Sequence, residues 1–389
     1  MTDLATELSS LGHEVTVLTT TPHYNVEPSA TAAYQMTSAG RGIFRGRVGN
    51  VAVWHLSMPM KGAKMASRMI DYVSFHLRSL WVAATRLGEF DVVIAPSPPL
   101  TIGLVAAAIG AAKRAPSIYN LQELFPDAVI NDGLLKNPAM IALMRFLERA
   151  VYSVSARIVT ISEAFADLLR KRAVPAKKIV VIPNFVDTTL YRPRQRQNDF
   201  AVSHGLKDFV ALYAGNIGAT QDWESLLHAA NSLRSAPITF VISGDGGRGE
   251  WLRTEVARRN LSNVKLLGYL PRELTPLVYA SSDIGVIPMK AGTTIDTFPS
   301  KVYTHFACAK PAVVSADDGS ELKRVIEDSG CGSVVAPGDP EALTTAIRSA
   351  FERRTSLADE GAKGRAYVER TYSKESVAAQ YSDLIASLL

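Results

Sequence analysis

The chain has 389 residues, of which 47% are apolar and 20% charged, so it is long enough for two globular domains with ordinary cores and too apolar for a disordered protein. Its two cysteines exclude a disulfide framework and favour a reducing cytoplasm, and the net charge of +5 does not by itself select a partner. The longest apolar run, residues 100–112, is shorter than the ~20 residues that cross a bilayer, and residues 1–11 lack the basic start of a signal peptide.

The chain opens with an amphipathic helical pattern at residues 1–11, and the first predicted strand follows at residues 14–19. A doubly wound α/β domain normally opens with a strand and a glycine-rich turn that presents backbone N–H groups to phosphate. That opening piece is absent from this sequence. We therefore expect the first domain to lack its first strand.

A basic and aromatic helix is predicted next, at residues 61–87. Its apolar residues include Met65, Met69, Tyr72, Phe75, Leu80 and Trp81, interleaved with Lys61, Lys64, Arg68, Arg78 and Arg86. Such a helix suits the surface of an anionic leaflet. A helix packed on the core, with its basic residues in solvent, explains the pattern equally well.

Short β-branched runs alternate with helical patterns along almost the whole chain, which predicts βαβ units around parallel sheets. Strands are predicted in two series, at 14–19, 51–55, 92–95, 117–120, 157–161 and 179–182, and at 209–214, 239–243, 264–267, 284–288, 312–315 and 332–335. The polar, basic segment 188–208 between the series reads as a linker. The pattern predicts two doubly wound domains, residues 1–190 and 191–370, with a last helix at 371–389 returning to the first. Ligands bind such sheets at their carboxyl edges.

Two glycine turns in the second domain follow predicted strands. Gly215, Asn216 and Gly218 come after the strand at 209–214, and the segment GDGG at 244–247 comes after the next strand. Glycines let the backbone approach a diphosphate, and the following helix N-terminus favours negative charge. A single turn of this kind is explained equally well as a plain connection between a strand and a helix. Their order and spacing with the blocks at 263–289 and 297–321 is far more specific.

Together these blocks resemble the donor-binding domain of glycosyltransferase family 4, whose GT-B fold has two facing Rossmann-like domains. The first domain agrees with this likeness in its segments SPPLTIGLVAAAIG, YNLQELFPDAVINDGLL and RIVTISEAFADLLRKRAVPAKKIVVIPNFVD. Within the family, the sequence is most similar to bacterial transferases of surface polysaccharide pathways, such as those of the fucosamine and colanic acid type. The resemblance covers nearly the whole chain.

The resemblance implies a nucleotide diphosphate sugar as donor, with UDP as the expected nucleotide. At the positions of two family glutamates this sequence has Asp296 and Thr304, and at those of a turn Arg and Lys it has Asn216 and Gln221. Lys301 is the available substitute cation, and a solvated lysine at a helix start is the alternative interpretation. The predicted donor-binding residues are Gly215, Asn216, Gly218, Gln221, Gly244, Gly246, Leu270, Phe298, Pro299, Ser300, Lys301 and Thr304.

In the first domain, Gln122 stands where many family members have a histidine. Glu123 and Asp127 follow it as candidates to hold the acceptor hydroxyl, and with Asp296 they form the predicted catalytic set; an acid at a helix start is also often only a cap. The predicted acceptor contacts are His23, Ser97 and Gln122.

Cleavage of a glycosyl phosphate bond leaves extra negative charge on the diphosphate. The sequence has no Asp-x-Asp pair to hold a metal ion, so we expect metal-independent catalysis without a cofactor. The family resemblance implies retention of anomeric configuration by front-face attack. It also implies a glycan or polyprenyl-linked acceptor at the inner face of the plasma membrane, and no nucleic-acid partner.

Two alternatives remain open. A GT-B-like UDP-sugar epimerase would share both domains, but such enzymes use first-domain acids and histidines at the sugar, and Gln122 speaks against it. A non-catalytic member that only binds a nucleotide sugar would be consistent with Asn216, Gln221 and Thr304.

Overall fold

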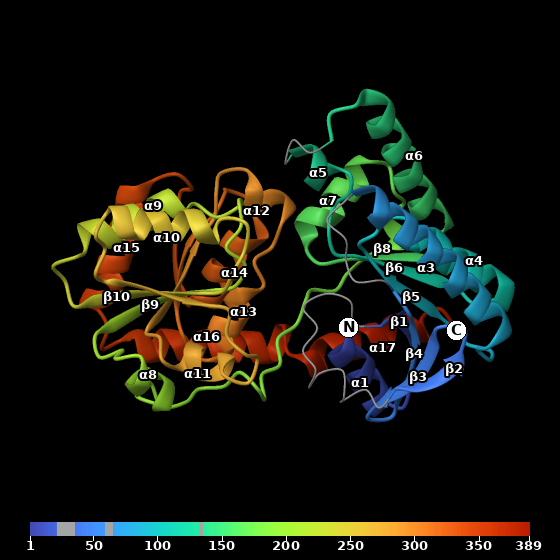
Figure 1. Cartoon of the computed structure of the whole chain (residues 1–389), viewed down its shortest axis with the longest axis horizontal. Helices are drawn as coiled ribbons and strands as arrows, with labels where there is room; N and C mark the ends of the chain where they lie inside the picture. Colours follow the sequence, from blue (N-terminus) through green and yellow to red (C-terminus); the bar gives the residue numbers. More distant parts are fainter. Residues whose placement is uncertain (22–35, 59–64, 132–134) are drawn as a thin grey trace. The chain divides into compact units, whose positions relative to one another are not determined.

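A computed structural model describes residues 1–21, 36–58, 65–131 and 135–389 of the chain (Figure 1). The chain forms two compact units, one of residues 1–183 with 377–389 and the other of residues 184–376. We call them unit 1 and unit 2. Within the described parts of the chain, no helix is both long enough and apolar enough to cross a membrane.

Unit 2 contains one six-stranded sheet in which all neighbouring strands are parallel. Its strands are β9 (Phe209–Ala214), β10 (Ile238–Ser243), β11 (Val264–Gly268), β12 (Ile284–Pro288), β13 (Ala312–Ser315) and β14 (Gly332–Val335). They lie in the order β11-β10-β9-β12-β13-β14. The order reverses between β9 and β12, and ligands of doubly wound sheets bind beyond the carboxyl ends of the strands at such a point.

Helices cover both faces of this sheet. They are α8 (Asp199–Ser203), α9 (Trp223–Ser232), α10 (Gly249–Arg258), α11 (Thr275–Ala280), α12 (Thr293–Asp296), α13 (Lys301–Ala307), α14 (Glu321–Ser329), α15 (Pro340–Glu352) and α16 (Leu357–Thr371). Successive side chains of a strand point to opposite faces, and β9 follows this rule. Phe209, Ala211 and Tyr213 join the core beneath α9, α10 and α15, whereas Val210 and Leu212 pack with α8 and α11.

Unit 1 contains two separate four-stranded sheets. One has the order β1-β4-β3-β2 and the other β5-β6-β7-β8. The strands are β1 (Thr16–Thr20), β2 (Thr37–Gly40), β3 (Ile43–Val48), β4 (Val51–Leu56), β5 (Val93–Pro96), β6 (Ser117–Leu121), β7 (Arg157–Thr160) and β8 (Ile179–Val181). The antiparallel strands β2 and β3 were not predicted, because their segment is rich in glycine and arginine and has no apolar run.

The two sheets of unit 1 end at β1 and at β5. In unit 2 the first strand, β9, lies between β10 and β12 and joins the two halves of the sheet. In unit 1, β1 and β5 take the places that β10 and β12 have in unit 2. Each pairs on one edge only, and no strand among the described residues pairs with the other edge. The two-domain α/β prediction is confirmed, and the described residues of unit 1 form two sheets where those of unit 2 form one.

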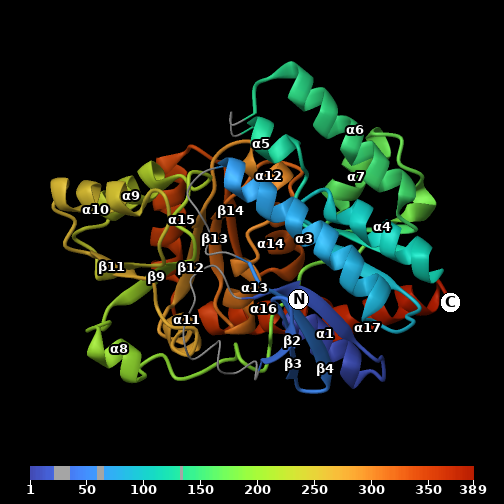
Figure 2. The ribbon, with the colours of Figure 1, turned by 45° about the vertical axis from the view of Figure 1, so that its right-hand side comes forward.

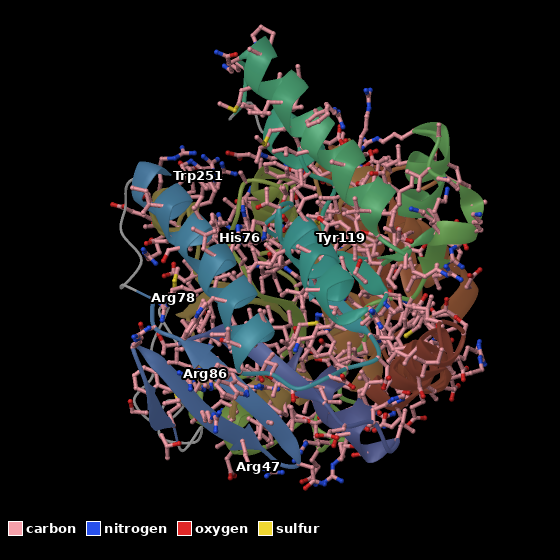
Figure 3. All side chains as sticks on the ribbon, turned by 90° about the vertical axis from the view of Figure 1, so that its right-hand side faces the viewer. Arg47, His76, Arg78, Arg86, Tyr119 and Trp251 are labelled. Carbon is pink, nitrogen blue, oxygen red and sulfur yellow. The ribbon has the colours of Figure 1, made fainter. Side chains whose placement is uncertain are left out.

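The helices of unit 1 are α1 (Thr2–Ser10), α3 (Met65–Thr85), α4 (Ile102–Lys113), α5 (Asp127–Asn131), α6 (Pro138–Val154), α7 (Glu163–Lys171) and most of α17 (Lys374–Ala386), with the 3-10 turn η1 (Ala176–Lys178) before β8. The helix α4 packs against both α3 and α6, so these three helices form one layer (Figures 2 and 3). The helix α17 returns to unit 1 and buries Val377, Ala378 and Tyr381 there.

Candidate functional site

The two glycine turns of unit 2 interlock at the carboxyl edge of its sheet. The Gly215 N–H donates to the Ser243 carbonyl at 2.9 Å, and the Ile217 N–H donates to the Asp245 carbonyl at 2.9 Å. Gly244 has a φ of +137°, and a Cβ at this position would overlap the carbonyl oxygen of Gly215. Only glycine fits this close approach of two backbones. The turns are therefore one rigid structure at the reversal point of the sheet.

Gln221 closes the first turn from within. Its Oε1 accepts a hydrogen bond of 2.9 Å from the Gly218 N–H, and its side chain is buried. Gln221 also forms a bridge with Met289, directly after β12. Asn216, by contrast, is exposed at the tip of the turn. Of these two predicted donor-binding residues, Asn216 is available to a ligand and Gln221 shapes the turn.

Lys301, the first residue of α13, reaches back to the end of β9. Its Nζ lies 2.6 Å from the hydroxyl of Tyr213 and 3.8 Å from the centre of the Tyr213 ring. The Tyr213 hydroxyl in turn donates a 2.5 Å hydrogen bond to the Asn216 carbonyl. A Cβ at Gly215 would lie 3.0 Å from the Lys301 Nζ. The predicted lysine and the predicted glycine turn thus lie side by side.

The charge of Lys301 has no counterpart in the described part of unit 2. Desolvation by burial lowers the pKa of Lys301 to about 7, and no carboxylate there offsets it. A cation removed from water is costly unless an opposite charge joins it. Together with turn amides and the start of α9, this arrangement favours binding of an anionic group such as phosphate.

The remaining predicted donor residues lie around this centre or beside it. Phe298 stacks on Tyr303 with ring centroids 4.8 Å apart, and Thr304 is half-buried one turn after Lys301. The Pro299 carbonyl accepts the Val302 N–H at 3.1 Å. Ser300 precedes α13 without a side-chain capping bond, Leu270 packs at the edge of the core beneath α11, and Gly246 lies in the second turn.

The loop after β12 carries the third predicted catalytic residue, Asp296, at the end of α12; its side chain lies outside the described part of the structure. Asp317 fixes this loop, because its carboxylate accepts hydrogen bonds of 2.6 Å from the Thr294 hydroxyl and 2.8 Å from the Gly292 N–H. The loop backbone also meets the glycine turn, where the Lys290 N–H donates to the Thr220 carbonyl at 2.9 Å.

In unit 1 the structure brings two predicted acceptor residues together. The Ser97 hydroxyl, after β5, accepts a 2.9 Å hydrogen bond from the backbone N–H of Gln122, after β6. The Gln122 side chain donates to the Asn120 Oδ1 at 2.6 Å. Glu123 beside them is exposed. The third predicted acceptor contact, His23, lies outside the described residues.

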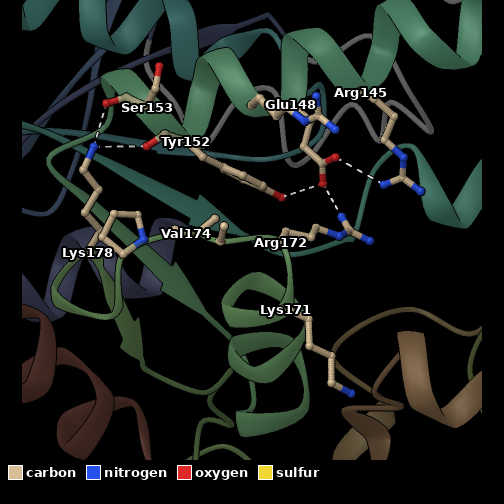
Figure 4. Close-up of a pocket in the computed structure, with 11 residues that line it drawn as sticks. Arg145, Glu148, Tyr152, Ser153, Lys171, Arg172, Val174 and Lys178 are labelled. Carbon is tan, nitrogen blue, oxygen red and sulfur yellow. Dashed lines mark hydrogen bonds and ion pairs between the residues drawn. The ribbon is translucent and has the colours of Figure 1, made fainter.

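Asp127 lies in an ion-pair network and is not a free carboxylate. Its oxygens accept hydrogen bonds from Arg145 and Arg172, and both arginines also bind Glu148. Tyr152 donates a 3.0 Å hydrogen bond to the same glutamate (Figure 4). Burial opposes ionisation of Asp127, but the hydrogen bonds and charges of the two arginines outweigh it and lower its pKa. This geometry favours a structural role over the catalytic role predicted for Asp127.

Sequence reasoning missed Tyr213 and the partners of Asp127. Tyr213 reads as an ordinary strand aromatic, and its position two residues before Gly215 was the available signal. Arg145 and Glu148 lie on α6 and Arg172 directly follows α7, and no spacing rule connects them to Asp127.

The chain matches two families of sequences. Residues 1–184 match the "Glycosyl transferase 4-like domain" and residues 195–367 match "Glycosyl transferases group 1". The colanic acid biosynthesis glycosyl transferase WcaI of Escherichia coli (strain K12) is 26% identical over 384 residues, covering 96% of this chain and 92% of that protein. The glycosyltransferase WbjE of Pseudomonas aeruginosa is 23% identical over 308 residues, covering 78% and 76% of the two chains.

Solved structures share the fold. Sucrose-phosphate synthase from Thermosynechococcus elongatus superposes with a TM-score of 0.74 at 17% identity, covering 99% of this chain and 91% of that one. Anabaena Alr3699/HepE in complex with UDP superposes with a TM-score of 0.69 at 15% identity, covering 96% and 100%. Two α/β units with these neighbours define the GT-B fold.

The two family matches, which together span almost the whole chain, make the assignment specific. The protein belongs to the glycosyltransferases, with a glycosyl transferase 4-like domain followed by a group 1 domain.

Proposed function

We propose that the protein is a retaining, metal-independent transferase that moves a sugar from a UDP-sugar to a glycan or polyprenyl-linked acceptor. The product would be a surface polysaccharide such as a capsule or an O-antigen, made in the cytoplasm at the inner face of the plasma membrane. One observation carries the donor part of this proposal. Lys301 places a cation without an anionic partner, among the described residues, against the glycine turn after β9.

The chemistry requires stabilisation of the leaving diphosphate, which gains negative charge as the glycosyl bond breaks. Lys301 supplies a point charge, and the turn at Gly215 and Asn216 supplies a close backbone approach. These groups take the place of the Arg and Lys that family members carry in the turn. UDP is the proposed nucleotide because a protein of the same fold, Anabaena Alr3699/HepE, has been solved with UDP.

Glu123 is the proposed acceptor-side residue. It is exposed beside the Ser97 and Gln122 pair at the carboxyl ends of β5 and β6, where it can hold an acceptor hydroxyl. In front-face attack the leaving phosphate helps to take the acceptor proton, and the configuration of the sugar is retained. Asp127 is excluded from this step because two arginines already occupy its carboxylate.

The helix α3 is the proposed membrane contact. It exposes Ile70, Val73, Leu77 and Trp81, whose spacing places them along one stripe. Arg78 serves the fold, since it donates to the Ser57 carbonyl at 2.7 Å and to the Gly42 carbonyl at 2.8 Å. An exposed apolar stripe on a helix of this kind supports peripheral binding to a bilayer.

The donor proposal is tested by thermal unfolding in the presence of a chelator with UDP, UMP or uridine. UDP at 100 times its dissociation constant should raise the free energy of unfolding by about 2.7 kcal/mol, and UMP and uridine at the same concentration by much less. UDP binding that requires manganese and disappears with chelator would contradict the proposal. Transfer of radiolabelled sugar to polyprenyl-linked acceptors, with NMR of the product anomer, tests acceptor and stereochemistry.

A further inference from the structure

A pocket of about 600 Å³ lies in unit 1 between α6 and the connection from α7 to β8 (Figure 4), whereas the proposed donor site belongs to unit 2. Its lining is strongly basic, with a single carboxylate, that of Glu148. The basic side chains are Arg145, Arg149, Lys171, Arg172 and Lys178. No step of the proposed transfer reaction uses them.

The charges of this pocket do not cancel. Asp127 and Glu148 balance Arg145 and Arg172 within the ion-pair network. Lys178 donates to two backbone carbonyls, those of Tyr152 and Ser153, which leaves its charge unbalanced. Arg149 and Lys171 are exposed, and neither has an ion-pair partner in the described part of unit 1. The pocket therefore carries surplus positive charge over a rigid, hydrogen-bonded wall.

The outer surface of α6 beside this pocket is apolar. Met140, Leu143 and Phe146 are 42%, 47% and 66% exposed, and they lie at i, i+3 and i+6 on the helix. Arg149 follows Phe146 by three residues, so the apolar stripe adjoins the basic lining on the helix surface. Large apolar side chains exposed in a row mark an interaction surface.

We propose that α6 docks on an anionic phospholipid bilayer, with the apolar stripe among the acyl chains and a lipid phosphate in the basic pocket. The proposal rests on the membrane part of the proposed function and names a second contact besides α3. Charge complementarity selects the occupant, because α6 itself carries one carboxylate, and both arginines of the network already neutralise it. An anionic headgroup is thus the partner that the surplus charge attracts.

Vesicle flotation of the full chain tests this surface. Vesicles of phosphatidylcholine alone are compared with vesicles that also contain phosphatidylglycerol, with and without inorganic phosphate as competitor. The variant Arg149→Gln/Lys171→Gln removes two of the three surplus charges, and Phe146→Ser removes the most exposed apolar side chain of the stripe. Lys207→Gln/Lys363→Gln and Val202→Ser are matched controls, since all three positions are exposed in unit 2.

The protein should float with the anionic vesicles, and the double charge variant should bind them roughly 25-fold more weakly, at about fivefold per cation. Phe146→Ser should weaken binding about tenfold, whereas both controls should bind like the parent. Equal binding of parent and variants, or equal binding to neutral and anionic vesicles, would overturn the proposal. So would self-association of the chain that Phe146→Ser abolishes without any vesicle binding. UDP-induced thermal stabilisation, measured on every variant, separates a failed docking surface from a failed donor site.

Discussion

The ammonium group of Lys301 and the hydroxyl of Tyr213 lie 2.6 Å apart, at the start of a hydrogen-bond chain that ends on the Asn216 carbonyl. This chain connects α13, the end of β9 and the tip of the glycine turn. A ligand phosphate that binds Lys301 therefore meets a cation whose position is already set by the sheet. Preorganised charge of this kind costs little reorganisation when the ligand binds or reacts.

Lys301→Ala should weaken UDP binding more than substitution of any other basic residue of unit 2. A charge-assisted contact is worth roughly 1.5 to 3 kcal/mol, so the dissociation constant should rise by about 10- to 150-fold. Isothermal titration calorimetry measures this change. Lys290→Ala is the control, because Lys290 is exposed and only its backbone meets the turn. Unchanged UDP affinity in Lys301→Ala would show that another cation holds the diphosphate.

UDP affinity should fall as the pH rises above about 7. Free Lys301 has a pKa of about 7 because of burial, and the diphosphate binds its protonated form. Each pH unit above that value should weaken binding by up to about tenfold, with proton uptake visible in buffers of different ionisation enthalpy. A pH-independent affinity between 7 and 9 would contradict a role for Lys301.

The stability of the ligand-free protein should rise with pH because of Lys301, whereas UDP affinity falls. The folded pKa of Lys301 lies below the ordinary lysine value of 10.5, so between about 7 and 10.5 the unfolded chain binds more protons. In that window the contribution of Lys301 to the free energy of unfolding rises with pH, and it stays constant below it. Urea denaturation of the parent and of Lys301→Met at several pH values isolates this contribution as a difference in slope.

Tyr213→Phe should reduce UDP affinity about tenfold, since one hydrogen bond to a charged group is lost. The ring packs edge-on against Trp223 with centroids 4.8 Å apart, and phenylalanine preserves that contact. Loss of the hydroxyl should also move the pH of half-maximal binding downward, because protonated Lys301 loses its acceptor. Tyr269→Phe, at an exposed tyrosine of the same unit, is the comparison. If both variants bind UDP equally, Tyr213 does not position the lysine.

Gly244→Ala should destabilise unit 2 strongly, by roughly 3 kcal/mol or more. The new Cβ would overlap the Gly215 carbonyl oxygen, and its φ of +137° is strained for any L side chain. Gly247→Ala, in the same turn, meets no atom within 4 Å and should be nearly neutral. Denaturant midpoints of the two variants test this contrast directly.

Asp127→Asn and Glu123→Gln should have opposite consequences. Asp127→Asn removes the negative charge that two partly buried arginines share, and it should lower the free energy of unfolding by roughly 3 kcal/mol. The second changes an exposed side chain and should leave stability within about 0.5 kcal/mol while lowering kcat about 100-fold. A stable but inactive Asp127→Asn would restore the catalytic role predicted from the sequence.

All twelve predicted strands occur in the structure within two residues of their expected ends, because buried parallel strands are continuous β-branched runs. The strands β2 and β3 escaped prediction for a physical reason. They form an antiparallel ribbon whose outer residues are half-exposed or exposed, and the turn at Arg41 and Gly42 adopts positive φ. Their pairing with β4, which no local pattern reveals, stabilises them.

The arrangement of the candidate site could be predicted from the sequence where it depends on backbone turns, and less so where it depends on contacts between side chains. Glycine turns have a spacing signature, and Lys301 stood out as the substitute cation once the turn lacked its own. The different surroundings of Asp127 and Glu123, four residues apart, depend on arginines from α6 and from directly after α7. Such long-range pairing becomes visible only in the folded chain.

The return of α17 to unit 1 gives the chain a fixed order of assembly during synthesis. His13, near the start, meets Ser382 at 2.8 Å, and Tyr381 is buried in the same unit beside Asn120. All of unit 2 lies between these partners in the sequence. Unit 1 therefore lacks its closing helix until the chain has been synthesised through unit 2. The apolar surface of unit 1 that α17 covers therefore stays open to chaperones and proteases until α17 has been synthesised.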